Sequence, residues 1–339
     1  MDYSEKNPDW IGWSEKVSAA TGKVGENLWI ENLRKNRELF RQRGKQWAND
    51  LQGLHKGKTA IMIGASPALA NQLNTLREIQ HDSDFVLFAI SCNLKYLLDN
   101  EIKPKYVITV DANESQGDFF DGLDMALTKD ITLITNTFSY PEMLKIWEGP
   151  LKWLALASGD KPMMKKQAKW YNPMNGIGYP FPALSSQYNI GTAVCVLVLQ
   201  CKIVIFVGNE LSFKDKEVTY YVDRKDEKDE WVRKPALDIY GNVVYTNYML
   251  SSLKISSEWF IDKIKNAAWW FNCTEAGIFG VSKRNGNEPH IWQLKLVTGI
   301  AQAREIMRTG EPFLLHRKGS IVESPRLDNI KIEHFQYAN

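Results

Sequence analysis

The sequence predicts an α/β fold built on a Rossmann-like, mostly parallel sheet with helices on both faces. Two observations support this prediction. Short, nearly continuous apolar runs recur from residue 59 to residue 208, and segments with helical character separate them. Runs that are apolar throughout are typical of parallel strands covered by helices on both sides. We also expect an N-terminal helical arm before the sheet and a small C-terminal elaboration after it.

The predicted elements alternate along the chain. The first strand covers residues 59–64 and leads into a helix over 67–79, with Pro67 in the first turn, where a missing N–H costs nothing. Later strands are assigned to runs rich in Val, Ile, Leu and Phe, and later helices to segments with apolar residues every three or four positions. In chain order they are a strand at 84–90, a helix at 93–100, strands at 106–111 and 131–136, a helix at 140–147, a strand at 151–156, a helix at 192–200, a strand at 202–208, and helices at 251–271 and 299–308.

Two charged segments lie outside this alternation. Residues 25–52 are expected to be helical, and we interpret their charged side as a solvated face or, alternatively, as an arm that packs on another subunit. The apolar positions of this segment are Leu28, Ile30, Leu33, Leu39 and Phe40. Residues 214–234 are expected to form an exposed hairpin or flap. The pattern as a whole predicts a helical segment at 1–56, a nucleotide-binding domain at 57–280 and a C-terminal extension at 281–339.

Composition excludes several classes of protein. The 42 basic and 40 acidic residues nearly balance, which argues against nucleic acid as the main partner. The four cysteines include no CxxC pair that would indicate a metal site or a redox dithiol. The longest apolar stretch, 193–208, is interrupted by Gln200 and Lys202, so no membrane span is expected. No signal peptide is recognisable at the N-terminus, and we therefore expect a cytoplasmic protein.

Candidate site residues follow from the predicted sheet, because ligands of such sheets bind outside the carboxyl ends of the strands. The small residues after the first strand precede a predicted helix, and a second such start is predicted at 189–192. Helix starts carry unpaired N–H groups that suit a phosphate. The residues expected to bind a nucleotide are Gly64, Ala65, Ser66, Asn93, Asn113, Asn189, Gly191, Thr192 and Asn209. Helix capping and turn formation are the alternative explanation for these residue types.

Carboxylates are the candidates for catalysis, since no histidine lies between residues 82 and 289. Asp111 and Glu210 each follow a predicted strand and could act as a general base if burial raises the pKa. Asp111 could also hold Mg²⁺ beside a phosphate. Thr274 and Glu275 belong to a late strand-to-loop segment that could return to the same edge of the sheet.

Five segments together resemble a known family. They are residues 63–69 (IGASPAL), 100–111 (NEIKPKYVITVD), 189–194 (NIGTAV), 205–211 (IFVGNEL) and 272–277 (NCTEAG). Their content and order resemble the sialyltransferase-like central domain of the motility-associated-factor (flagellin) glycosyltransferases. The archaeal 6-hydroxymethylpterin pyrophosphokinases share this superfamily. The chain departs from the pattern at Ser66 and Ala68, and it has Tyr220 and Tyr221 where relatives place a histidine.

The resemblance implies a donor sugar and an acceptor. The implied donor is a nonulosonic sugar activated as its cytidine monophosphate (CMP) derivative. The acceptor would be a protein hydroxyl or a glycan, and the chain could form a homo-oligomer. By the same likeness Gly64, Ala65, Ser66 and Asn93 would contact the nucleotide, with Asp111 beside its phosphate. The alternatives are a pyrophosphokinase that uses Mg²⁺ and ATP, and a catalytically silent nucleotide- or sugar-binding protein.

Overall fold

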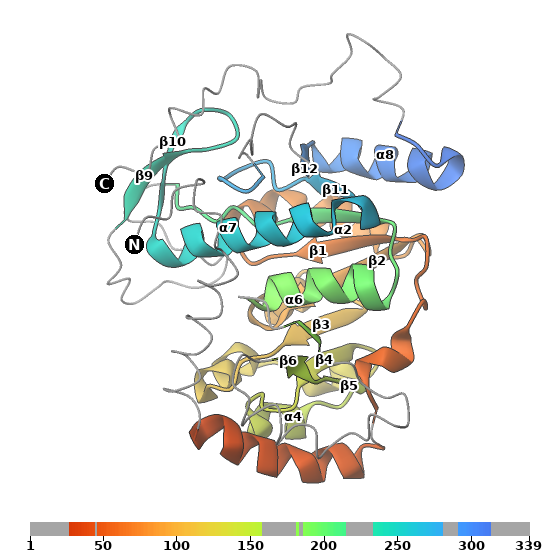
Figure 1. The fold of residues 1–339 in the computed structure, drawn as a ribbon, viewed down its shortest axis with the longest axis vertical. Coiled ribbons are helices and arrows are strands. Elements are labelled where there is room, and N and C mark those ends of the chain that lie inside the picture. Colours follow the sequence, from red (N-terminus) through yellow and green to blue (C-terminus); the bar gives the residue numbers. More distant parts are fainter. Residues whose placement is uncertain are drawn as a thin grey trace. The chain divides into compact units, whose positions relative to one another are not determined.

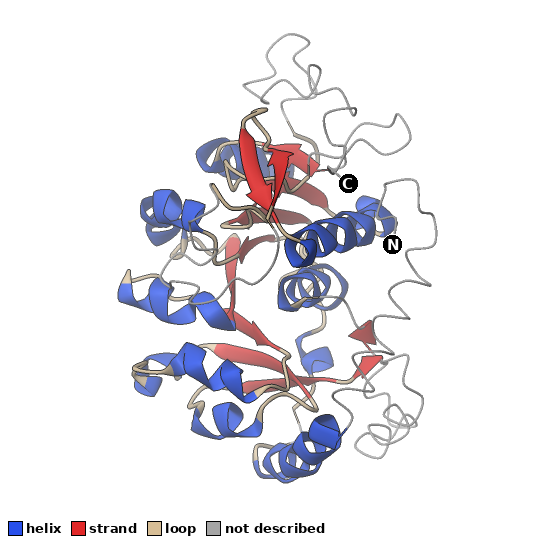
Figure 2. Ribbon diagram, turned by 90° about the vertical axis from the view of Figure 1, so that its left-hand side faces the viewer, coloured by secondary structure: helices blue, strands red, loops and turns tan. Residues whose placement is uncertain are grey.

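The computed structural model describes residues 27–44, 46–157, 181–182, 186–214, 233–280 and 291–312. It confirms the α/β fold and the mostly parallel, Rossmann-like sheet. The hydrogen-bonded strand order is β12-β11-β8-β1-β2-β3-β4-β5, and the pairs with a described register are parallel. Figure 1 shows the strands coloured along the chain, and Figure 2 shows helices on both sides of them.

The elements have the following bounds. The strands are β1 (Thr59–Ile63), β2 (Phe85–Ile90), β3 (Tyr106–Thr109), β4 (Thr132–Asn136), β5 (Leu151–Leu154), β6 (Leu156–Ala157), β7 (Phe181–Pro182), β8 (Ile203–Val207), β9 (Lys234–Leu237), β10 (Val243–Thr246), β11 (Trp269–Asn272) and β12 (Ile291–Gln293). The α-helices are a first helix over residues 27–42, α2 (Leu73–Ile79), α3 (Leu94–Asp99), α4 (Pro141–Ile146), α6 (Gln187–Ala193), α7 (Tyr248–Lys263) and α8 (Leu296–Thr309). Two 3₁₀ helices matter below, η2 (Pro67–Gln72) and η4 (Glu114–Phe120).

The chain divides into two compact units, each made of two stretches of sequence. Unit 1 comprises the described parts of 1–54 and 88–199, and unit 2 those of 55–87 and 200–339. Strand β2 contributes residues to both. Past residue 280, β12 pairs with β11 in parallel, and α8 follows it. The domain boundaries expected at 56 and 280 stay a prediction.

Strands β3, β4 and β5 of unit 1 form a buried parallel ladder. Its register pairs Tyr106 with Thr132 and Leu133 with Leu151. Phe88 of β2 stacks on Tyr106, with their ring centroids 4.7 Å apart. These strands are almost entirely buried, as expected for a sheet covered on both sides.

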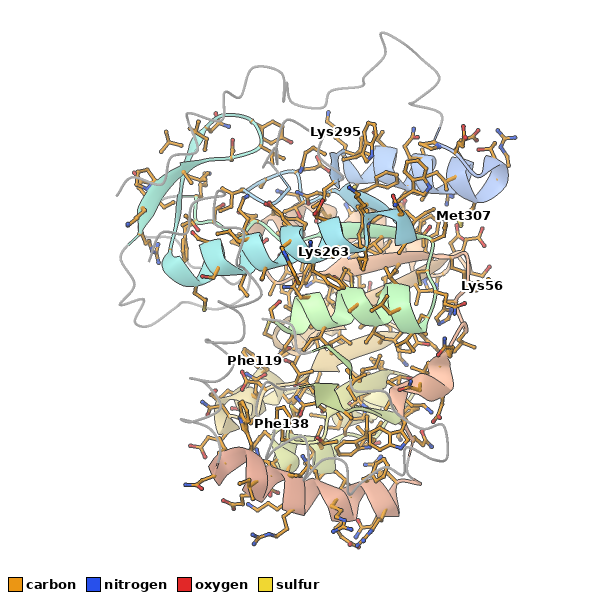
Figure 3. The ribbon with its side chains drawn as sticks, viewed as in Figure 1. Lys56, Phe119, Phe138, Lys263, Lys295 and Met307 are labelled. Atoms are coloured by element: carbon orange, nitrogen blue, oxygen red, sulfur yellow. The ribbon has the colours of Figure 1, made fainter. Side chains whose placement is uncertain are left out.

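The helix over residues 27–42 is docked on unit 1 of its own chain. Asn32 and Asn36, one turn apart, are 2% and 0% exposed. Asn32 Nδ2 donates to the carbonyls of Ala112 (2.9 Å) and Phe138 (3.2 Å). Trp29 stacks on Phe138 at 5.0 Å, beside the helix in Figure 3. One side of the helix therefore packs on its own unit, and its charged side is exposed, as the first interpretation predicts. Packing of that side on another subunit stays a prediction.

Asn36 fixes the helix over residues 27–42 to the loop after β4, and this role can be tested. Asn36 Nδ2 donates to the carbonyls of Thr137 (3.2 Å) and Ser139 (2.8 Å) in the loop after β4. We expect Asn36→Ala to lower the free energy of unfolding by about 2 kcal/mol, because two buried carbonyls lose their donor. Urea denaturation measures the loss. Arg37→Ala, on the exposed side of the same helix, should change the value by less than about 0.5 kcal/mol; equal effects would contradict the anchoring role.

In unit 2 the strands β1, β8 and β11 run parallel and are almost entirely buried. Ile61 pairs with Ile205, and Phe271 pairs with the same residue from the other side. The turns after β1 and β8 touch, since a Cβ on Gly64 would clash with the carbonyl oxygen of Gly208 and lie 2.9 Å from its carbonyl carbon. Gly208 itself has a φ of +60°. Both glycines are therefore required by backbone packing.

Unit 2 also corrects the sequence-based assignment of elements. Residues 269–271, expected at the end of a long helix, form strand β11 instead, after α7 has ended at Lys263. Aromatic residues favour strands, and a 3₁₀ turn over 265–267 separates the two elements. The antiparallel hairpin β9–β10 and strand β12 were not expected. Most of the flap expected at 214–234 lies outside the described residues.

Candidate functional site

The turn after β1 uses its backbone donors within the protein. Gly64 N–H donates to Val207 O (2.8 Å), and Ser66 N–H to Gly208 O (3.0 Å). The N–H of Ala68 donates to Oε1 of Glu210 (2.5 Å). The helical segment that follows begins as the 3₁₀ helix η2, and α2 itself has only seven residues. A glutamate carboxylate therefore lies where a phosphate was expected, and the expected α-helix start at 67 is not formed.

Glu210 is held from three directions in unit 2. Its carboxylate accepts from Ala68, its N–H donates to Ser66 Oγ (3.3 Å), and its carbonyl accepts from Ile278 N–H (2.8 Å). The side chain is 7% exposed. Burial raises the pKa of this carboxyl, although the hydrogen bonds from Ala68 and Ser66 act in the opposite direction. A positioned carboxyl with a raised pKa is suited to proton transfer.

The loop after β11 packs on the same residue. Gly277, with a φ of +79°, leaves no room for a Cβ against the backbone of Glu210. Thr274 Oγ1 accepts the N–H of Asn209 (3.1 Å). The structure thus brings Ser66, Asn209, Glu210 and Thr274 together at the carboxyl ends of β1, β8 and β11.

Glu275 has a structural partner instead. Its Oε1 accepts the N–H of Leu296 (2.9 Å), the first residue of α8. That bond satisfies one of the open donors of the helix start. Glu275 is therefore explained by capping.

In unit 1 the loop after β3 carries the exposed residues Asp111 and Asn113. Oδ1 of Asp111 accepts the N–H of Asn113 (3.2 Å), and Oδ1 of Asn113 accepts the N–H of Ser115 (3.5 Å). Asn113 is the N-cap of η4. Asn93, at the end of β2, is fully buried at the start of α3. Helix capping accounts for Asn113. The carboxylate of Asp111 is exposed, so a ligand can reach it.

The second helix start lies earlier than expected. Helix α6 begins at Gln187, with Ser186 as N-cap, and Ser186 Oγ accepts the N–H of Asn189 (3.1 Å). Thr192 Oγ1 donates to the carbonyl of Tyr188 (2.8 Å). Asn189, Gly191 and Thr192 are therefore buried inside the helix and do not form its start. Serine is a strong N-cap residue, so Ser186 was the signal for the helix start that the prediction of a start at 189–192 missed.

Two glutamines that sequence reasoning missed complete the unit 1 strand ends. Ser91 Oγ, directly after β2, donates to Gln187 Oε1 (2.9 Å). Gln187 Nε2 donates to Gln116 Oε1 (2.9 Å), and Ser91 Oγ lies 3.4 Å from the same oxygen. This set, the Ser91–Gln187–Gln116 relay, joins the ends of β2 and β3 to the start of α6. Gln116 follows β3 by seven positions, and this place after a strand was the available signal.

The fit of Mg²⁺ rests on Asp111 alone. Among the described residues, no three His, Cys, Asp or Glu side chains are grouped as a metal site. Mg²⁺ in phosphate-binding sites is often held by one or two carboxylates plus the phosphates themselves. Asp111 can supply one such carboxylate. In the same described part of the chain, no helix is both long and apolar enough to cross a membrane.

The fold and these strand ends define a Rossmann-like α/β protein with polar loops at the carboxyl edge of its strands. Residues 29–216 match the family described as 6-hydroxymethylpterin diphosphokinase MptE-like. Because that match covers more than half of the 339 residues, the chain belongs to the MptE-like family. No curated protein matches the chain.

A solved structure has a similar fold. It is the MAf glycosyltransferase from Magnetospirillum magneticum AMB-1, with a TM-score of 0.52 and 16% sequence identity. The similarity covers 76% of this chain and 38% of that one, so this chain spans well under half of the MAf protein. The family match and this fold confirm the predicted superfamily.

Proposed function

We propose that the chain is a glycosyltransferase that uses a CMP-activated nonulosonic sugar as donor. The observation that carries the proposal is Glu210, a buried carboxyl fixed at the carboxyl end of β8 with a raised pKa. The motif order of the sequence and the fold shared with a MAf glycosyltransferase support it. The acceptor would be a hydroxyl of a protein or a glycan.

The reaction is a displacement at the anomeric carbon of the donor. The acceptor oxygen forms a bond to that carbon, the bond from the carbon to the phosphate oxygen breaks, and CMP leaves with the electron pair. The acceptor proton passes to the carboxylate of Glu210, which the N–H of Ala68 holds in place, while the backbone N–H of Glu210 donates to Ser66 Oγ.

A second candidate is transfer of diphosphate from ATP to an alcohol. The description of the matched family favours it. Asp111 would hold Mg²⁺, which would neutralise charge on the phosphates when bound. The described residues of the loop after β8 include no histidine. A catalytically silent nucleotide- or sugar-binding protein is the third reading.

A thermal-shift panel separates these functions. CMP should raise the melting temperature without Mg²⁺, and ATP should raise it less. Asp111→Ala should remove most of the CMP response, because the exposed carboxylate loop contacts the nucleotide. Asp121→Ala, an exposed aspartate of the same region, is the matched control and should keep the response.

The other outcomes contradict the proposal in distinct ways. A response to ATP that needs Mg²⁺, with none to CMP, would favour the diphosphokinase. Stabilisation by CMP without release of CMP from the donor would favour the silent binder. An unchanged response in Asp111→Ala would show that the nucleotide binds elsewhere.

A further inference from the structure

The Ser91–Gln187–Gln116 relay has a direction. Ser91 Oγ donates to Gln187 Oε1, and Gln187 Nε2 donates in turn to Gln116 Oε1. Gln116 Oε1 therefore receives one short hydrogen bond and lies within 3.4 Å of a second donor, Ser91 Oγ. The side-chain oxygen of Gln116 therefore accepts a hydrogen bond from within the protein. Its NH₂ group, which can only donate, is the part of the amide that can bind a ligand.

The NH₂ group of Gln116 has no acceptor in the described part of the chain. The residue is only 7% exposed. The rest of the side chain is packed, but the NH₂ group itself keeps some access to solvent, so water or a ligand can meet it. The relay thus holds a pair of N–H donors in a fixed orientation beside the strand ends of unit 1.

The place of Gln116 is suited to a ligand. It lies in η4, the 3₁₀ helix marked by Phe119 in Figure 3, directly after the loop with the exposed Asp111 and Asn113. Ser91 follows β2, the parallel neighbour of β3. Ligands of parallel sheets bind at this edge.

We propose that Gln116 is the residue that recognises the nucleobase, and that it selects cytosine over uracil. This inference rests on the proposed use of a cytidine nucleotide. Cytosine presents two adjacent acceptors, N3 and O2, which match a donor-only amide. Uracil carries a hydrogen on N3, so the same amide would face a donor. Mismatched donors left unpaired in a buried site are the usual source of strong discrimination.

Isothermal titration of the full chain with CMP, uridine monophosphate and ribose 5-phosphate tests the assignment. The wild type should bind CMP about tenfold more tightly than the uridine nucleotide. Gln116→Leu should reduce that ratio to within about twofold and leave the affinity for ribose 5-phosphate unchanged. Gln116→Glu keeps the side-chain volume and the acceptor of Gln187 but removes the donors, and it should also lose the preference for CMP.

Gln42→Leu is the matched control, an exposed glutamine of unit 1 that bonds only to Glu38 among the described side chains. It should keep the full ratio. Equal binding of the two nucleotides by the wild type, or an unchanged ratio in both Gln116 variants, would overturn the assignment while the proposed function stands. Absence of any nucleotide binding would overturn the proposed function and this assignment together.

Discussion

Glu210→Gln is expected to lower kcat for release of CMP from the donor sugar by about 10²–10⁴-fold. The amide keeps an oxygen that can accept from Ala68 N–H, so the turn after β1 should stay intact. It cannot take up the acceptor proton. Steady-state assay of CMP release measures the effect, and circular dichroism checks the fold.

Asp238→Asn is the matched control for this substitution. Asp238 is another buried carboxylate of unit 2, 7% exposed, which accepts from the N–H groups of Tyr240 and Asn242 in the β9–β10 hairpin. In the part of the chain that the structure describes, its carboxylate bonds only within the hairpin and to none of Ser66, Glu210 and Thr274, so kcat should change by less than about twofold. A Glu210→Gln enzyme with nearly normal kcat would remove Glu210 from catalysis and leave it as a structural cap.

The pH dependence of stability gives a second readout for Glu210. Burial raises its pKa above the ordinary value of 4.5, so the folded state disfavours the ionised form. The contribution of Glu210 to stability is therefore fully present below pH 4.5 and is lost as the pH rises through the folded-state pKa. Glu210→Gln should lack this loss. Urea unfolding of the wild type and of Glu210→Gln should be compared from about pH 4 upward, because the difference in the free energy of unfolding gives the contribution of Glu210. The same pH dependence in both proteins would contradict a raised pKa of Glu210.

Gly64→Ala is expected to lower the free energy of unfolding by about 3 kcal/mol in the absence of any ligand. The new Cβ would meet the carbonyl oxygen and carbon of Gly208, which are backbone atoms between two buried strands and cannot move aside cheaply. Urea denaturation of the apoprotein measures the loss. A glycine kept only to admit a phosphate would show no such effect.

Gly117→Ala provides the comparison. A Cβ at Gly117 would lie 3.4 Å from a side-chain atom of Tyr140, an ordinary contact with a group that can shift. The expected change is below about 1 kcal/mol. If Gly64→Ala were equally mild and instead abolished the response to CMP, the turn after β1 would be a ligand site and not a packing contact.

The sheet could be predicted from the sequence because its strands carry their own signal. Runs such as residues 59–63 and 203–207 are apolar on both faces, and the structure places parallel strands there. The strand-end rule also selected Ser66, Asn209 and Glu210, which the structure brings together. Local pattern was sufficient for these features.

The missing parts depend on contacts between residues far apart in sequence. Glu210 reaches Ala68 across 142 positions, so no local pattern shows that a carboxylate fills the turn. Gln116 and Gln187 are 71 positions apart, and only their hydrogen bond to each other marks them as candidate site residues. The tryptophans of β11 were assigned to a helix because an aromatic run suits both elements.

Hydrogen–deuterium exchange with and without CMP tests the central claim most directly, namely that the loops at the strand ends bind a nucleotide. We expect slower exchange in peptides covering residues 91–93 and 111–116 when CMP is present. Peptides of the β9–β10 hairpin serve as an internal reference and should not change. Unaltered exchange in the two loops at saturating CMP, or protection confined to the hairpin, would contradict the account.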